Sequence, residues 1–557
     1  MKHEHRQTRR LLWAIVVAAA ILRAWGLWFG LPHALARPDE REAIEHAIAI
    51  AAGDLNPRFF HWPSLQFYVL AFVFRIDALL RPGLPAALGT LPFGHYAMLA
   101  RGWVALTGVL TVPVAYRLTR RAAGAEAGLA AAAFLAVAPL HVRDSHFAMT
   151  DVTMTWLVLC SLWLLVEGAT RIEEAGAASL RSSRNFGPWI VLSAGVVGGL
   201  ATGTKYTAAA ILAPAAVAQV SIAVRARPRP STGVVVPGLA FLGGWAAGVL
   251  LSTPYAVLDF ARFRADLLFD VSHLAAGHGP DLGPGWIRHL SFSLPYGLGI
   301  ATFLAAIVGT IVAARRGGLA NWLVLTFAGV VYIVTGRGHT VFARYVLPLV
   351  PVGCMMAGQA VASLARTRQL PRWALPALVA FIAVPSAVNS AWLDVLLSRP
   401  DSRVIAARWI GARLPPGATL YESGREYVQL TIASQDFHRW YYDPATQHFA
   451  GARPDMLPEW LILHRSPLGE YTPIPEPIEL LARTRYTPIQ VIRGTRGDGN
   501  PADYDLQDAF FLPLTGFRRV LRPGPTITVY LRRDPGPGRL PGDVEEPLSG
   551  AGRRPDR

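Results

Sequence analysis

The sequence predicts an all-α polytopic membrane protein with a small α/β domain at its C-terminal end. Hydrophobic residues make up 52% of its 557 residues, only 16% are charged, and the mean hydropathy is +0.33. Long apolar runs recur up to residue 392, after which the chain becomes richer in charge, Pro and Gly. This composition excludes a water-soluble globular enzyme.

Eleven apolar runs are expected to cross the membrane as helices. They are residues 11–30, 97–118, 124–140, 149–166, 189–201, 207–224, 234–251, 291–313, 319–335, 342–364 and 373–392. A twelfth run, residues 64–80, is shorter and carries Arg75 and Asp77. We interpret it as an amphipathic or re-entrant helix within a long first external loop, residues 31–96.

The basic connections predict the sidedness of these helices. With a cytoplasmic N-terminus and with residues 64–80 at the surface, all five short basic connections fall on the cytoplasmic side, as the positive-inside rule requires. These connections are 117–121, 171–184, 225–229, 315–316 and 366–372. If residues 64–80 were counted as a span, all five basic connections would fall outside the cytoplasm, against the positive-inside rule.

The same parity gathers other polar segments at the outer face. They are residues 141–151, the turn at Lys205, residues 253–290 and residues 336–345, together with Asp39 and Glu40. A charged cluster beside membrane spans is seldom without function. We therefore expect an outward-facing active site.

The sequence suggests three domains. Residues 1–391 form the transmembrane module, and residues 392–533 form an external α/β domain with strand-like stretches such as "ATLYES", "PEWLILH" and "TITVYLRR". Residues 534–557 are rich in Gly and Pro and are expected to be disordered.

The charged residues suggest transfer chemistry. An enzyme outside the cytoplasm has no ATP or nucleotide sugar, so its donor must be activated and membrane-anchored, as a polyprenyl phosphate sugar is. Transfer needs a carboxylate that accepts a proton from the acceptor, and cations that hold the departing phosphate. The candidate carboxylates are Asp39, Glu40 and Asp151, and the candidate cations are Lys205, Arg337 and Arg344.

Each candidate also has a purely structural interpretation. Asp39 with Glu40, and likewise Asp151, fit the acidic first turn of a helix. Lys205 fits a side chain that extends from a span to the membrane interface, and Arg337 and Arg344 fit ordinary loop charges. The sequence leaves these alternatives open.

The composition bears on cofactors and partners. Cys160 and Cys354 lie in apolar runs, so no disulfide framework or Cys-ligated zinc site is expected. No cofactor is expected; a divalent cation is open, because several histidines lie in the outer segments, but none has a metal-ligand spacing. The net charge of +16 comes with arginines placed between apolar runs, which argues for topology rather than nucleic-acid binding.

Five motifs, in order along residues 11–390, resemble glycosyltransferase family 39 of the C superfamily of membrane glycosyltransferases (GT-C). That family includes protein O-mannosyltransferases and lipid A aminoarabinose transferases. The motifs are "RPDE" with the helix after it, "HWPSLQFYVLAFVFRI", "HVRDSHFAMTDVTMTWL", "GLATGTKYTAAAILAP" and "ARYVLPLVP". In the second motif the family reads His-Pro-Pro, whereas here Trp62 and Pro63 follow His61.

The resemblance implies a GT-C fold and roles for residues within these motifs. Asp39 corresponds to the catalytic carboxylate, Glu40 completes the acidic pair, and Asp151 corresponds to the acidic residue of the second loop. We expect substrate-positioning side chains at four further positions in the same motifs: His61, Tyr68, His146 and Tyr345.

We therefore expect an inverting glycosyltransferase in the cell (inner) membrane, with a cytoplasmic N-terminus and an extracytoplasmic C-terminal domain. It would move a sugar from a polyprenyl phosphate donor to a protein, lipid or glycan acceptor on the outer face. Asp39 would be the base, and Glu40 and Asp151 would position the acceptor or the base. Lys205 and Arg344 would hold the lipid phosphate. A transporter or flippase of a lipid-linked saccharide is the alternative; it should show repeats and broken helices, which the sequence does not reveal. A non-catalytic assembly subunit would need no convergent carboxylates.

Overall fold

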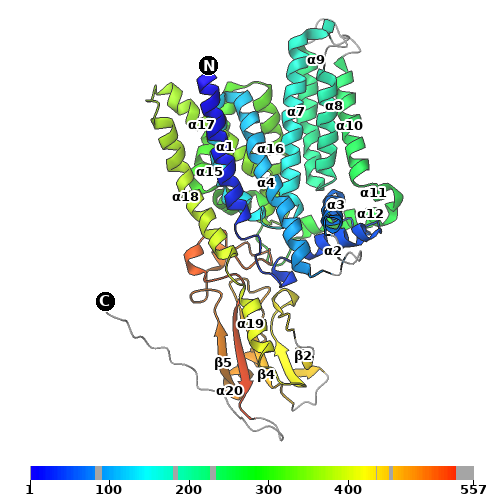
Figure 1. Cartoon of the computed structure of the whole chain (residues 1–557), viewed down its shortest axis with the longest axis vertical. Coiled ribbons are helices and arrows are strands. Elements are labelled where there is room, and N and C mark those ends of the chain that lie inside the picture. The colour runs from blue at the N-terminus through cyan, green and yellow to red at the C-terminus, as the bar shows by residue number, and fades with distance from the viewer. Residues whose placement is uncertain are drawn as a thin grey trace. The chain divides into compact units, whose positions relative to one another are not determined.

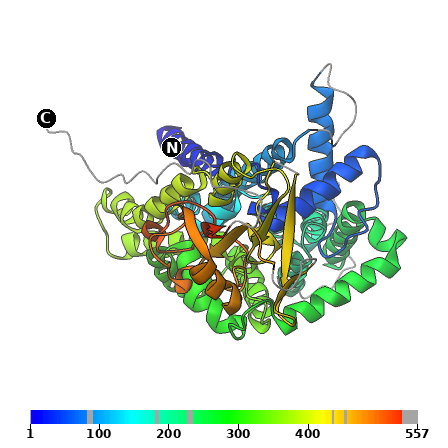
Figure 2. The ribbon, with the colours of Figure 1, turned by 90° about the horizontal axis from the view of Figure 1, so that it is seen from below.

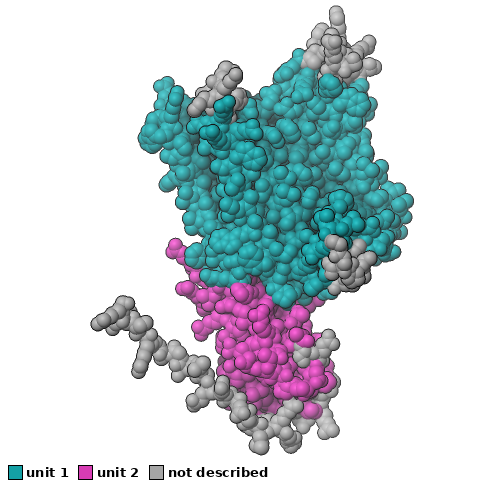
Figure 3. Space-filling view, in the orientation of Figure 1, with its two compact units in different colours: residues 1–399, 505–508, 513–517 teal, residues 400–504, 509–512, 518–557 magenta. Residues whose placement is uncertain are grey.

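A computed structural model describes residues 2–81, 89, 91–179, 186–225, 234–433, 436–450 and 456–534. The chain forms two compact units, coloured separately in Figure 3. Unit 1 comprises Met1–Arg399, Asp505–Asp508 and Pro513–Phe517, and unit 2 comprises Pro400–Tyr504, Ala509–Leu512 and Arg518–Arg557. Two short stretches from the C-terminal region thus belong to unit 1. Apart from Asp534, the tail expected to be disordered lies outside the described residues.

Unit 1 is a helical bundle. Its long helices run side by side, whereas α2, α3, α11 and α12 lie across one end (Figure 1). Its helices are α1 (Lys2–Ala24), α2 (Pro38–Ala52), α3 (Leu65–Leu79), α4 (Phe93–Ala123), α5 (Ala125–Ala136), α6 (Pro139–Asp144), α7 (Thr150–Ser179), α8 (Gly187–Thr202), α9 (Leu212–Arg225), α10 (Val236–Ser252), α11 (Tyr255–Leu258), α12 (Phe260–Ala276), α13 (Gly285–Arg288), α14 (Leu294–Leu298), α15 (Ile300–Arg316), α16 (Leu319–Arg337), α17 (Leu349–Thr367) and α18 (Ala374–Leu397). The described residues of the unit also form three short 3-10 helices, η1 (Ala34–Ala36), η2 (Tyr206–Ile211) and η5 (Ala343–Val346), and a short π-helix, η4 (His289–Ser293).

Six helices of the described chain are long and apolar enough to cross a membrane, which makes this a multi-pass membrane protein. These spans are Phe93–Ala123, Thr150–Glu174, Tyr206–Arg225, Leu319–Arg337, Leu349–Thr367 and Ala374–Gly411. The other expected spans fall on α1, α5, α8, α10 and a bent helix pair, so a count of eleven remains a prediction. The run at residues 64–80 forms the 15-residue helix α3, too short to span alone.

One expected span is not a single straight helix. Residues 291–313 were expected to be continuous, but the chain bends by 112° between Gly285–Leu298 and Ile300–Arg316. Gly299 occupies the break with a φ of +84°, where its absent side chain permits a conformation that other residues rarely adopt. The expectation of unbroken spans is therefore wrong at this position.

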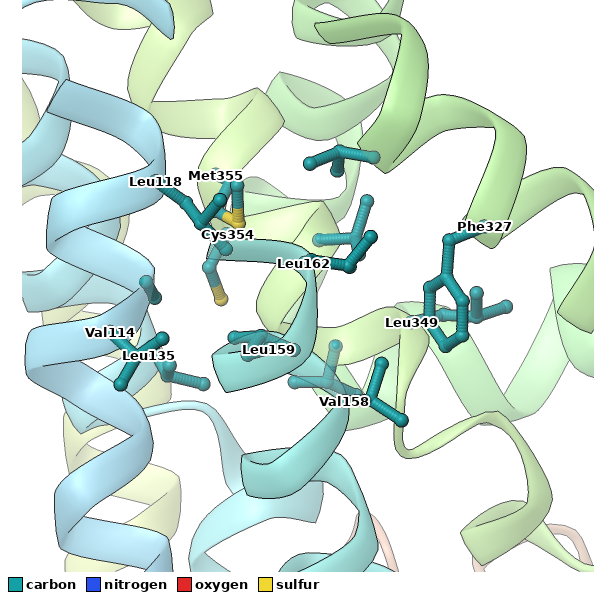
Figure 4. Packing of buried hydrophobic residues seen from close by; sticks show 14 of the residues in the cluster. Val114, Leu118, Leu135, Val158, Leu159, Leu162, Phe327, Leu349, Cys354 and Met355 are labelled. Atoms are coloured by element: carbon teal, nitrogen blue, oxygen red, sulfur yellow. The ribbon is translucent and has the colours of Figure 1, made fainter. Parts of the chain in front are cut away.

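The core of unit 1 is apolar and closely packed. Figure 4 shows Val114 and Leu118 of α4 near side chains of α5 and α17, with residues of α7 in the middle of the cluster and Phe327 of α16 on its far side. Cys354 of α17 is completely buried in this cluster, and both cysteines of the chain are free thiols. Burial among aliphatic side chains explains why these cysteines behave as packing residues.

Helices α8 and α10 pack closely together through glycines that lie four residues apart within each helix. A Cβ on Gly199 would lie 2.2 Å from the carbonyl oxygen of Trp245, and a Cβ on Gly244 would lie 2.4 Å from that of Leu192. Small residues at this spacing let two membrane helices bring their backbones into contact. These glycines therefore set the α8–α10 distance.

Unit 2 is a small α/β domain, as expected. Its six-stranded sheet has the order β3-β2-β1-β4-β6-β5, with β1 parallel to both neighbours and β6 antiparallel to both of its own (Figure 2). Alternating buried side chains pack against α19 through Ile410 and against α20 through Ile478. Its elements are α19 (Ser402–Gly411), β1 (Ala418–Glu422), η6 (Glu426–Val428), β2 (Phe437–Asp443), β3 (His448–Ala450), β4 (Trp460–Arg465), α20 (Glu476–Arg485), β5 (Tyr486–Ile492), η7 (Pro501–Asp503) and β6 (Thr526–Arg532).

The glycine contact predicts a sharp difference between two neighbouring positions of α10. Gly244→Leu places a side chain against the backbone of α8, so we expect a lower melting temperature of the detergent-solubilised protein. Gly243→Leu is the matched control, because a Cβ there meets nothing within 4 Å. Equal melting temperatures for the two variants would contradict this account of the α8–α10 contact.

Candidate active site

The site begins at the first turn of α2, and the local sequence explains why the helix starts there. Pro38 occupies the first turn, where its missing N–H is no loss, and Asp39 and Glu40 follow it near the positive end of the helix dipole. Gly53 ends the helix in the left-handed conformation with a φ of +119°. The motif "RPDE" thus fixes the start of α2 and places two carboxylates there.

Asp39 presents an accessible carboxylate to a cation. Its Oδ2 lies 2.9 Å from Nη2 of Arg344, and its side chain is 35% exposed. The guanidinium of Arg344 also lies 4.3 Å from the ring centroid of Phe342. A partly exposed carboxylate held beside a fixed cation can accept a proton from a bound hydroxyl, provided that the hydroxyl comes within hydrogen-bond reach.

Glu40 lies beside Asp39 in sequence but in a different environment. It is completely buried, and its two oxygens accept hydrogen bonds of 2.8 and 2.6 Å from Arg101 of α4. Its Oε1 also accepts a bond of 2.7 Å from the backbone N–H of Ala148. Glu40 therefore ties α2 to α4 and to the segment before α7. The expectation that Glu40 positions the acceptor or the base stays a prediction, and these contacts give it a structural role beside Asp39.

Asp151 and Lys205 form a second ion pair. Asp151 stands in the first turn of α7 and accepts a hydrogen bond from Nζ of Lys205 through Oδ1, at 2.5 Å. The ammonium also lies 4.9 Å from the ring centroid of Tyr345, the residue after Arg344. The row Asp39, Arg344, Tyr345, Lys205 and Asp151 is therefore continuous. Sequence reasoning predicted that these residues lie at one end of the bundle.

Two other expected positioning residues make contacts elsewhere. His61 lies with Nδ1 3.0 Å from Oδ1 of Asp270 in α12, and burial raises the pKa of that carboxyl above its usual value. The hydroxyl of Tyr68 donates to the carbonyl oxygen of Leu55 at 3.0 Å. Both side chains belong to the surface layer of α3 and α12 and take no part in the row.

The remaining two expected residues also stand apart. His146 is completely buried, with its ring nitrogens 2.9 and 3.0 Å from the carbonyl oxygens of Val142 and Trp25. These contacts leave it no free nitrogen for a substrate, so its expected positioning role gains no support. Arg337 ends α16 with its side chain exposed. Its assignment to the donor phosphate remains a proposal without a contact to support it.

The structure adds a cluster that sequence reasoning missed. Arg344 also donates to Oδ1 of Asp508 through Nη1, at 3.3 Å. Oδ1 accepts from Arg37 as well, and Oδ2 accepts from Arg143 at 3.0 Å. Burial opposes ionisation of Asp508, but the three arginines outweigh it and hold its pKa well below the usual range. Asp508 is therefore charged and fully engaged by cations.

Asp144 completes the charge set beside this cluster. It lies 3.4 Å from Nε of Arg143 and is almost completely buried. Burial raises the pKa of Asp144 to about 6, against the attraction of Arg143 and Arg37. The described part of the chain holds no group of three or more His, Cys, Asp or Glu side chains that could bind a metal.

Residues 86–230 match the family model described as dolichyl-phosphate-mannose-protein mannosyltransferase. The match covers α4 to α9, including Arg101, Asp151 and Lys205. It confirms the predicted resemblance to glycosyltransferase family 39. The match thus agrees with the class expected from the sequence motifs, a membrane glycosyltransferase. No curated protein matches the sequence.

Two solved structures align with much of this chain. The archaeal oligosaccharyltransferase AglB from Archaeoglobus fulgidus, in complex with an inhibitory peptide and a dolichol-phosphate, is 15% identical, covering 74% of this chain and 58% of its own, with a TM-score of 0.49. ArnT from Cupriavidus metallidurans in the apo state is 17% identical, covering 93% of this chain and 97% of its own, with a TM-score of 0.49. The present chain thus spans 58% of the length of AglB.

The buried contact of Glu40 predicts a structural defect. Glu40→Gln keeps the size of the side chain but leaves Arg101 without its countercharge, and breaking one partner of a buried ion pair costs about 3–5 kcal/mol. We expect a lower melting temperature and faster proteolysis in the first loop. Glu45→Gln is the matched control on α2, because Glu45 is 51% exposed and pairs only at the surface with Arg41. Similar behaviour of the two variants would contradict a structural role for Glu40.

Proposed function

We propose that this protein transfers a sugar, with inversion, from a polyprenyl phosphate donor to an acceptor on the outer face of the cell membrane. The observation that carries the proposal is the partly exposed carboxylate of Asp39, held 2.9 Å from the guanidinium of Arg344 at one end of a membrane bundle. The family model over residues 86–230 supports a lipid phosphate donor, because dolichyl phosphate mannose is such a donor.

The proposed reaction is a single displacement. The acceptor hydroxyl oxygen attacks the anomeric carbon while the bond from that carbon to the phosphate oxygen breaks. Asp39 takes the hydroxyl proton, and the bond electrons leave with the polyprenyl phosphate. One displacement with one base inverts the anomeric configuration and needs no covalent intermediate.

The cations in the row suit the leaving group. Negative charge grows on the phosphate as the sugar departs, and a fixed cation out of bulk water stabilises that charge. Arg344 is 11% exposed and Lys205 is 17% exposed, so both are largely shielded from water. We assign them to the donor phosphate, and we assign Asp151 to holding Lys205 in place.

The outer-face location follows from the charge pattern of the connections. The span parity expected from the sequence puts the residues of the row on the side of the membrane opposite the five basic connections, which the positive-inside rule assigns to the cytoplasm. The same rule supports a cytoplasmic N-terminus and, with an odd number of spans, an extracytoplasmic C-terminal domain.

Incubating the purified protein with polyprenyl phosphate sugars and cell-envelope acceptor material tests the function. Acceptor-dependent release of free polyprenyl phosphate is expected. The bend at Gly299 is one feature that a transporter would also show. In liposomes, movement of the intact lipid-linked sugar across the bilayer without cleavage would support the transporter instead.

Asp39→Asn keeps the shape of the side chain but removes the base. We expect transfer to fall by about 10²- to 10⁴-fold with normal membrane insertion. Asp54→Asn is the control, because Asp54 lies just beyond the other end of α2 and pairs with Arg58 at the surface. Turnover at the wild-type rate by the Asp39→Asn variant would refute the assignment of Asp39 as the base.

Lys205→Met removes the ammonium but keeps an apolar stem of similar length. We expect a marked rise in the donor KM or a fall in kcat, with the acceptor KM little changed, because a cation aimed at the phosphate has no contact with the attacking hydroxyl. Lys205→Arg should retain much of the activity, since it keeps a cation beside Asp151. A change confined to the acceptor KM, or no change, would move the phosphate site away from Lys205.

A further inference from the structure

Asp508 reaches the site from the far end of the sequence. The stretch Asp505–Asp508 belongs to unit 1, although it follows the last helix of that unit by more than a hundred residues. The side chain of Asp508 is only 5% exposed and contacts three guanidinium groups, those of Arg37, Arg143 and Arg344. Three charge-assisted contacts to one buried carboxylate are more than helix capping or surface solvation requires.

Neighbouring side chains anchor this stretch to the loop that carries Arg344. Asp505 accepts a hydrogen bond of 2.7 Å from the backbone N–H of Ala343. Gln507 accepts one of 2.6 Å from the N–H of Val341 and donates one of 2.9 Å to the carbonyl oxygen of His339. Asp508 is therefore fixed relative to the backbone on either side of Arg344, and not only to its charge.

Arg344 divides its two terminal nitrogens between two carboxylates. Nη2 lies 2.9 Å from Asp39 and Nη1 lies 3.3 Å from Asp508. Because a guanidinium is planar and rigid, a carboxylate on one nitrogen fixes the direction of the other. The contact with Asp508 thus aims the second nitrogen at Asp39.

We propose that Asp508 is a positioning residue of the active site: it orients Arg344 toward Asp39 and balances the charge of Arg37 and Arg143 there. The orienting role follows from the geometry, and its effect on catalysis rests on the proposed function. A segment after the transmembrane bundle is then a necessary part of the site.

The charged groups around Asp39 and Arg344 determine whether loss of the Asp508 charge makes position 39 a stronger or a weaker base. The cations are Arg37, Arg143 and Arg344, with Lys205 next to them beside Asp151 and Tyr345. The anions or titratable groups are Asp39, Asp144, Asp151, Asp505, Asp508, His278 and Tyr345. Removing the charge of Asp508 leaves three fixed cations with less compensation. An acid at position 39 then loses its proton more readily and is a weaker base.

The first experiment measures transfer against pH for the full-length protein, with mannose, glucose and arabinose esters of polyprenyl phosphate as donors. For D508N we expect kcat at neutral pH to fall about tenfold or more, and the acidic limb of the profile to move to lower pH. D508E, which keeps the charge, should recover part of the rate and the wild-type limb. D498N is the matched control, because Asp498 is exposed in unit 2. A D508N profile identical to that of the wild type would overturn the proposal.

The second experiment needs no turnover. D39C introduces a thiol at the position of the base, and its alkylation rate by iodoacetamide is followed against pH with and without D508N. Protein without D39C corrects for the native thiols of Cys160 and Cys354. With D508N we expect the half-maximal rate at a pH lower by about one unit, the size of shift that a nearby charge produces. An unchanged titration would overturn the positioning role.

Together, the two experiments test the positioning role of Asp508 separately from the proposed sugar transfer. A shifted thiol titration, with no transfer by the wild type, would uphold the position of Asp508 and refute the proposed function. If D508N does not fold, Q507A replaces it, because it loosens the anchor while keeping every charge. A shifted titration in Q507A would support the proposal, and a titration like that of the parent would overturn it.

Discussion

The buried ion pair between Glu40 and Arg101 is the interaction on which the candidate site depends. Arg101 binds both oxygens of Glu40 and donates to the carbonyl oxygens of Leu27 and Phe29, so one guanidinium joins α4, α2 and the turns that follow α1. Glu40 in turn accepts from Ala148, just before α7. With Glu40 held this way, Asp39, which lies about 100° away around the helix, faces Arg344 instead. Glu40, which looks redundant beside Asp39 in the sequence, is therefore the residue that positions Asp39.

The sequence predicted which charged residues gather at one end of the bundle, but it did not predict which of these side chains pair with each other. Adjacent residues at a helix start point about 100° apart, so one of Asp39 and Glu40 was bound to face inward, and nothing in the local pattern says which. The parity of the spans did predict that Asp39, Asp151, Lys205 and Arg344 lie at one end of the bundle. It could not predict the pairing of Lys205 with Asp151, because that depends on side-chain packing between α7 and the turn before η2.

Asp508 lay beyond reach of the sequence for a different reason. Its partner Arg37 is 471 residues away, and "DYDLQDAFF" carries no periodic or motif signal that connects it to the bundle. For His61, Tyr68 and His146 the expected positioning role stays a prediction that no contact with the row supports. These residues fall in recognisable motifs, yet the structure gives them contacts with α12, with a loop carbonyl and with buried backbone. The motifs indicate which segments contribute to the candidate site. Only the tertiary contacts show which side chains of those segments face the site and which support the fold.

The division of Arg344 between two carboxylates suggests how the site keeps its charge balanced during the proposed transfer. Before reaction, Asp39 and Asp508 are both anionic and share one guanidinium. When Asp39 takes the acceptor proton its attraction for Nη2 weakens, at the moment when the departing phosphate gains negative charge. Asp508 is held by Arg37 and Arg143 as well, so it keeps its charge and its place. Arg344 can then exchange a neutralised carboxylate for a phosphate without moving, and the cation needs no reorganisation as the bond breaks.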